Sequence, residues 1–221
     1  MQRKFEFSVD EYYHIFNRGT DKRIIFVDDY DREYFITLLY LCNSARPIDS
    51  REIKKAGDPF LFERGGRLVF IGAWCLIPNH FHLLVKEAIE GGVSKFILKI
   101  GTAYSSYFNR RHGRSGHLFQ GPFQARHVAD DRYLEYLYAY IHINSVDLYL
   151  PGWKEKGFKD SKASMKFMEK YPFSSYSDYR GVDRVWGKIL DQQQFPDYFS
   201  EENSFENLVK GFLEWETEVD A

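Results

Sequence analysis

The chain of 221 residues is 44% hydrophobic, which is enough to bury a core in one domain that carries an extension. Its formal net charge of -2 excludes a uniform positive coat of the kind that binds nucleic acid over the whole surface. The charge is nevertheless uneven, because residues 91–129 contain no Asp or Glu whereas the residues after Pro196 are rich in both. A local basic surface is therefore compatible with the nearly neutral total.

The cysteines and the apolar runs predict a cytoplasmic protein. Cys42 and Cys75 lie in apolar surroundings, which favours small core residues in a reducing compartment over a disulfide. No apolar run approaches the roughly twenty residues of a membrane span, and residues 1–13 lack the apolar region of a signal peptide. We expect no membrane partner, and an association with the nucleoid if the protein binds DNA.

The first predicted elements are a strand and a helix. Residues 12–18 alternate between apolar and polar side chains, which predicts a strand. A helix opened by Asp29 or Asp31 is predicted to run to Asn43, because apolar side chains recur three and four residues apart. Residues 46–66 are polar and contain Pro and Gly, so we expect an inserted loop there.

The middle of the chain predicts a β-hairpin and a second helix. Residues 67–77 and 80–87 have the pattern of two strands, with Pro78 and Asn79 as their turn. A helix capped by Ser94 is predicted over residues 94–111, and a basic loop punctuated by glycines follows it.

The last predicted elements are a strand and a helix. Residues 119–128 predict the strand, and two consecutive aspartates precede a helix predicted over residues 132–144. A Pro-Gly pair then ends the core, so we predict a catalytic domain at 1–150 and a helical or irregular C-terminal extension at 151–221. The order of the elements predicts an α+β fold with a ferredoxin-like antiparallel sheet and helices packed on one face.

Two histidines open the second strand of the predicted β-hairpin. Strand alternation points His80 and His82 to the same face, where two imidazoles can bind one cation. The turn just before them would hold the pair rigidly near the end of the sheet. Histidines in strands are more often packed or hydrogen-bonded residues, and that alternative stays open.

Tyr140 and Asn144 are one helical turn apart and could offer a phenol and an amide oxygen to the same cation. The alternative for Tyr140 is a packed core residue, and for Asn144 a helix cap. Tyr133 and Tyr136 share the predicted helix and are rival candidates, but Tyr140 is the one that precedes Asn144 by a turn.

If these pieces meet, His80, His82 and Asn144 would hold a divalent ion that keeps open positions for a substrate oxygen. Nitrogen and oxygen ligands without Cys favour Mg²⁺ or Mn²⁺ over zinc. Tyr140 would then stand beside a polarised phosphodiester. A nearby cation favours its phenolate, which is the nucleophilic form.

The residues that are candidates for DNA contact lie mainly in and after the basic loop. This stretch combines positive charge with Phe119 and Phe123, as expected for phosphate contact and base stacking. A solvated basic loop is the alternative. The candidates for DNA contact are Arg110, Arg111, Arg114, His117 and Arg126, with Arg18 at the end of the first strand.

Six motifs follow one another along the chain: YHIFNRG, DDYDREYF, IPNHFHLL, YFNRRHGRSGHLFQGPFQ, YIHIN and PFSSY. In this order they resemble the REP-associated tyrosine transposases, relatives of the single-tyrosine insertion-sequence transposases with a His-hydrophobic-His motif. The resemblance covers residues 10–180, and Ser145 stands where the family pattern usually has proline.

The resemblance implies an enzyme that nicks and rejoins single-stranded DNA next to hairpins, as a monomer or a homodimer. It implies that His80 and His82 are metal ligands, Tyr140 the nucleophile and Asn144 the third, amide-bearing ligand. Two alternatives remain: a non-catalytic protein that binds DNA hairpins and regulates, and a metal-dependent phosphodiesterase in which water attacks.

Overall fold

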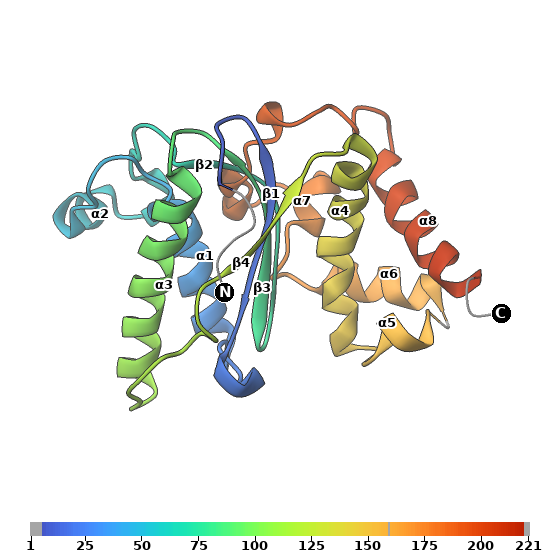
Figure 1. Cartoon of the computed structure of the whole chain (residues 1–221), viewed down its shortest axis with the longest axis horizontal. Helices are drawn as coiled ribbons and strands as arrows, with labels where there is room; N and C mark the ends of the chain where they lie inside the picture. The colour runs from blue at the N-terminus through green and yellow to red at the C-terminus, as the bar shows by residue number, and fades with distance from the viewer. Residues whose placement is uncertain (1–5, 159, 219–221) are drawn as a thin grey trace.

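Four strands form one antiparallel sheet in the structure, a computed structural model that describes residues 6–158 and 160–218. Figure 1 shows the sheet between two groups of helices. Residues 1–5 of the predicted domain, and residues 159 and 219–221 of the predicted extension, lie outside the described part. All four strands fall within segments that the sequence predicts, and the sheet has the order β2-β3-β1-β4, with β1 (Tyr12–Arg18), β2 (Val69–Ile77), β3 (His80–Glu87) and β4 (Gln124–Val128).

The β-hairpin forms where it was predicted. Pro78 and Asn79 make the turn, and Ile77 pairs with His80 as the two strands leave it. A bulge between Ile71 and Ala73 shifts the register, so that these two residues join opposite hydrophobic cores. The imidazole pair therefore begins β3, at the end of the sheet that holds this turn.

The helices α1 (Asp29–Leu41) and α3 (Gly92–Arg111) pack on one face of the sheet. Alternate residues of the strands, among them Ile15, Phe81 and Leu83, fill the core between these helices and the sheet. The chain order of strand, helix, two strands, helix and strand, with this strand order in space, is the predicted ferredoxin-like topology.

The opposite face is also covered, which differs from the prediction of helices on one face alone. Leu84 and other residues on that side of the strands form a second hydrophobic core and need their own cover. The α+β class is confirmed, with helices on both faces (Figure 1). The helices that share this second core are α4 (Asp131–Ile143), which packs on the strands, α8 (Ser204–Glu218), which packs on α4, and α5 (Trp153–Lys156), α6 (Ser161–Lys170) and α7 (Tyr176–Tyr179).

The residues that cap the starts of α1 and α3 differ from the prediction. Asp28, rather than Asp29 or Asp31, caps α1, because its carboxylate accepts the backbone N–H of Asp31. Helix α3 starts at Gly92, before the predicted Ser94 cap, and the preceding Gly91 has a φ of 69°, which glycine adopts readily.

The predicted loop at 46–66 contains a short helix, α2 (Ser50–Ala56), and a 3-10 turn, η2 (Pro59–Leu61). Asp49 caps the helix by accepting the backbone N–H of Arg51. No residue of α2 is buried, so the helix lacks the apolar stripe from which the sequence could have predicted it.

The predicted C-terminal extension attaches to the edge strand β2. The backbone N–H of Leu76 donates to the carbonyl of Phe173 at 2.9 Å, and that of Ser175 donates to the carbonyl of Trp74 at 2.9 Å. Further along, the 3-10 turns η4 (Val185–Ile189) and η5 (Gln192–Gln194) precede α8. Within the described ranges, no helix is long and apolar enough to cross a membrane.

Candidate active site

A cavity of about 430 Å³ lies on the sheet face that α4 covers. Side chains of the three strands β3, β1 and β4, most of them on one face of the sheet, line it together with the loop before β4 and one tyrosine of α4. The lining residues are His14, Phe16, Asn17, Arg18, His80, His82, Gln120, Gln124, Arg126 and Tyr140.

The register of the strands explains why these side chains meet. Side chains two residues apart share a face of a strand, and cross-strand partners stand beside each other. The cavity thus collects a row of neighbours: Arg18 is paired with His80, Phe16 with both His82 and Gln124, and His14 with Arg126.

Both predicted metal histidines form a hydrogen bond through Nδ1. His80 Nδ1 lies 2.5 Å from the side-chain oxygen of Asn79, and His82 Nδ1 lies 2.9 Å from Nε2 of His14. An oxygen of an amide only accepts, so His80 donates from Nδ1. Metal-binding histidines commonly donate one ring N–H to such a partner and bind the cation through the other nitrogen, which for these two residues would be Nε2.

Tyr140, on α4, packs against His82 and His14. The centroid of its ring is 6.0 Å from that of His82 and 5.8 Å from that of His14, and it is nearly perpendicular to both rings. The structure thus brings Tyr140, His80 and His82 to one cavity, although His80 and Tyr140 are sixty positions apart in the chain.

Asn144 lies one turn beyond Tyr140 but is not among the cavity-lining residues. It is 2% exposed, and its side-chain N–H donates to the carbonyl of Tyr140 at 2.6 Å. The chain continues from α4 directly into the 3-10 helix η3 (Asn144–Leu148), so Ser145 does not end the helical path as a proline would. Asn144 therefore caps α4, and its role as a metal ligand stays a prediction.

The donor set of the cavity suits a divalent cation that takes further ligands from water or substrate. In the described part of the chain, no three His, Cys, Asp or Glu side chains gather into a metal cluster. The imidazoles of His80 and His82, whose Nδ1 atoms form hydrogen bonds, offer two nitrogen ligands. The side-chain amides of Gln120 and Gln124 line the same cavity and could offer oxygen ligands. Such mixed nitrogen and oxygen donors fit Mn²⁺ or Mg²⁺.

The residues predicted to contact DNA separate into two groups. Arg18 and Arg126 line the cavity, where the Arg126 guanidinium lies 5.9 Å from the ring centroid of Phe16. His117 lines a different cavity of about 780 Å³ beside α3, while Arg114 packs 5.9 Å from the ring centroid of Phe108. Arg110 is exposed near the end of α3.

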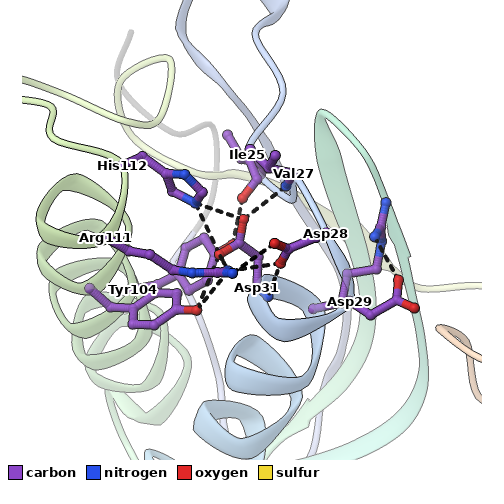
Figure 2. A network of polar contacts seen from close by, with 10 residues as sticks. Ile25, Val27, Asp28, Asp29, Asp31, Tyr104, Arg111 and His112 are labelled. Atoms are coloured by element: carbon purple, nitrogen blue, oxygen red, sulfur yellow. Dashed lines mark hydrogen bonds and ion pairs between the residues drawn. The ribbon is translucent and has the colours of Figure 1, made fainter.

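Arg111 forms ion pairs instead of lining the cavity. Its guanidinium binds the carboxylate of Asp28 at 2.7 Å and that of Asp31 at 2.5 Å, as Figure 2 shows. His112 reaches the same Asp31 carboxylate at 3.0 Å. The hydrogen bond from Arg111 lowers the pKa of Asp28, and the two carboxylates raise the pKa of Arg111. The network joins the end of α3 to the start of α1.

His14 is the site residue that the sequence did not single out. It lies on the same face of β1 as Phe16 and Arg18, and it is 3% exposed. The sequence signal that could have identified it is its position four residues before Arg18 in the predicted strand, which places both side chains on the same face. Its contact with His82 could not be predicted, because it depends on the register between β1 and β3.

A model of a known protein family matches part of the chain. Residues 67–144 match a family model described as "Transposase IS200 like", and this range contains His80, His82, Tyr140 and Asn144. A solved structure of a REP-associated tyrosine transposase bound to a REP hairpin has 16% identity and a TM-score of 0.49, over 84% of this chain and 88% of that one. No curated protein sequence matches the chain. The resemblance to the IS200-like transposases is confirmed over the matched residues.

Proposed function

We propose that this protein is a single-tyrosine transposase that nicks and rejoins single-stranded DNA next to hairpins, with Tyr140 as its nucleophile. The observation that carries the proposal is the cavity shared by Tyr140, His80 and His82. The family match supports it, because the matched segment contains all three residues. The substrate class follows from the motif resemblance and from the arginines of the cavity.

The phenolic oxygen of Tyr140 would attack the phosphorus of a phosphodiester. The phenol loses its proton as the new bond to phosphorus forms. The bond from phosphorus to the 3′ oxygen breaks, and the leaving oxygen takes up a proton. The products are a 5′-phosphotyrosine and a free 3′ hydroxyl, with no net consumption of bond energy. A 3′ hydroxyl can therefore reverse the step and join two DNA ends.

His80 and His82 would hold Mg²⁺ or Mn²⁺, with Asn144 as the proposed third ligand. When bound, the cation supplies Lewis-acid polarisation of the phosphate and favours the phenolate over the phenol. Arg18 and Arg126 would bind the phosphates on either side of the scissile bond, since guanidinium groups pair well with phosphate oxygens. We place the catalytic unit at 1–150 and the extension at 151–221, in a cytoplasmic protein.

A covalent adduct tests the proposal. The full chain is incubated with Mn²⁺ and labelled single-stranded DNA that carries a hairpin, then denatured and separated by size. We expect labelled DNA that stays attached to protein after denaturation. Cleavage without an adduct would support a phosphodiesterase, and binding without cleavage would support a non-catalytic DNA-binding regulator.

A further inference from the structure

His14 contacts the proposed metal ligand and the proposed nucleophile at once. Its ring is nearly parallel to that of His82, with an interplanar angle of 22° and centroids 5.1 Å apart, and perpendicular to that of Tyr140. His14 and His82 are 3% and 5% exposed. Each buried ring in such a contact restricts the positions that the other can adopt.

The contact between His14 Nε2 and His82 Nδ1, at 2.9 Å, couples the protons of the two rings. In a neutral pair, one nitrogen carries the hydrogen and the other accepts it. If His82 donates from Nδ1, its Nε2 keeps a lone pair for a cation. If His14 donates from Nε2, His82 carries its hydrogen on Nε2 and cannot bind a cation there.

Carboxylates often accept the second N–H of a metal histidine, yet no Asp or Glu is among the described residues that line this cavity. The nitrogen that His82 Nδ1 meets here belongs to His14, 2.9 Å away. A neutral imidazole can accept a hydrogen through such a nitrogen.

We propose that His14 is a positioning residue, which accepts the Nδ1–H of His82 and thereby fixes His82 in the tautomer whose Nε2 can bind a divalent cation. The effect of this tautomer on metal binding rests on the proposed function, whereas the tautomer itself can be observed without metal or DNA.

Nitrogen NMR of the full chain tests the tautomer directly. With ¹⁵N-labelled histidine at about pH 8.5, where free imidazole is neutral, we expect His82 of the wild type to carry its hydrogen on Nδ1. His14→Leu removes the acceptor, so the Nε2–H form of His82 becomes populated. His14→Gln places an amide oxygen where Nε2 was, and restores the Nδ1–H form.

Binding of Mn²⁺ alone, followed by the electron paramagnetic resonance signal of the free ion, tests the consequence. His82→Ala should abolish binding, and His14→Leu should weaken it by about 10- to 100-fold, as for other partners of metal ligands. His14→Gln should bind nearly as well as the wild type. His127→Leu is the matched control, because His127 lies on β4 and contacts Glu11.

The two measurements separate the inference from the proposed function. If His14→Leu keeps both the Nδ1–H form of His82 and wild-type Mn²⁺ binding, His14 has no positioning role, while the proposed reaction stands. If the wild type shows the Nδ1–H form but does not bind Mn²⁺, the metal chemistry of the proposed function fails and the tautomer coupling stands. A wild type with hydrogen on Nε2 of His82 overturns the inference.

Discussion

The ring of Tyr140 has surroundings that the neighbouring tyrosines of α4 lack. Tyr133, Tyr136 and Tyr140 stack in a row along the helix, with centroids 6.0 Å apart at each step. Tyr136 also packs on Phe212 of the extension. Of these three, Tyr140 is the one that lines the cavity with the histidines.

Removing the hydroxyl of Tyr140 should therefore abolish strand joining without unfolding the protein. Tyr140→Phe keeps the ring that packs on His14 and His82, and it removes the hydroxyl that we propose as the nucleophile. Joining of labelled DNA ends and thermal unfolding are measured in parallel. Tyr133→Phe and Tyr136→Phe, on the same helix, should retain joining, and a loss in either of them with activity left in Tyr140→Phe would identify a different nucleophile.

His142 lies two residues from Tyr140 but faces the core. It is 0% exposed, its Nδ1 donates to the carbonyl of Tyr138 at 2.7 Å, and its Nε2 accepts from the hydroxyl of Ser175 at 2.7 Å. Burial lowers the pKa of His142 to about 4. The neutral ring thus ties α4 to the C-terminal extension.

The lowered pKa of His142 predicts how stability depends on pH. The unfolded chain takes up the proton near its ordinary pKa of 6.5 and the folded protein only near 4, so stability falls as the pH drops between these values. The loss should be on the order of 3 kcal/mol. Urea unfolding at a series of pH values measures it, and His142→Gln should remove this part of the dependence. The same dependence of stability on pH in the wild type and in His142→Gln would contradict this role of His142.

Among single residues, the sequence predicted His80, His82 and Tyr140 as neighbours because strand alternation, the spacing of a helical turn and one motif resemblance pointed to them. It could not decide between cap and ligand for Asn144, since both roles suit an amide at the end of a helix. His14 was missed for a different reason. Its partner lies on another strand, and only the register between strands reveals it.

Helices α1 and α3 are held together at one end by the buried carboxylate of Asp31. It accepts the backbone N–H of Val27 at 2.9 Å and the hydroxyl of Tyr107 at 3.2 Å, besides its contacts with Arg111 and His112 (Figure 2). The basic loop begins directly after this joint, so the network fixes where the loop leaves α3.

Asp31→Ala should lower the free energy of unfolding by about 2 kcal/mol, because it leaves two neutral donors of the network, a backbone N–H and a phenol hydroxyl, without their acceptor. Asp29→Ala is the matched control, since Asp29 lies in the same helical turn and pairs with Arg32 at a side-chain exposure of 72%. Its effect should stay below about 1 kcal/mol. Urea denaturation compares the two, and similar losses would contradict a structural role for the network.

Among the elements, periodicity predicted every strand of the described sheet and the helices α1, α3 and α4. It failed for α2, whose exposed side chains follow no apolar pattern. It also failed to place α4 on the opposite face from α1 and α3. Helix periodicity gives the apolar side of a helix but not the face of the sheet against which it packs.

Over the whole molecule, fewer positive charges are available to bind DNA phosphates than residues 91–129, which lack Asp and Glu, suggest. Arg111 is compensated by two carboxylates, whereas Arg18 and Arg126 lie at the cavity. The sequence gives the number of charges but not their partners. The acidic residues that neutralise Arg111 precede it by about eighty positions.

Replacing Arg18 and Arg126 together by Ala should weaken binding of single-stranded DNA and flatten its salt dependence. Each lost phosphate contact should reduce the slope of log K against log salt by about 0.7. Arg51→Ala is the control, because Arg51 pairs with Asp49 at a side-chain exposure of 89% and is not among the cavity-lining residues. Fluorescence anisotropy over a series of salt concentrations measures the slope, and an unchanged slope would move the DNA surface elsewhere.

The extension completes the fold around the helix that carries Tyr140. Ser175, from the PFSSY motif, accepts the backbone N–H of Trp74 at 3.0 Å and contacts His142 of the YIHIN motif. The PFSSY and YIHIN motifs, for which the sequence shows only their order, are thus in direct contact. Their common partner is β2, which no local pattern could have revealed.

The most direct test of the active centre is to identify the residue that carries DNA. After reaction with Mn²⁺ and hairpin-bearing single-stranded DNA, the adduct is digested and its peptides are sequenced by mass spectrometry. A nucleotide 5′-phosphate on Tyr140, lost in His80→Ala and His82→Ala proteins that still bind the DNA, is the predicted result. An adduct on another residue, or one that forms unchanged without the two imidazoles, would contradict it.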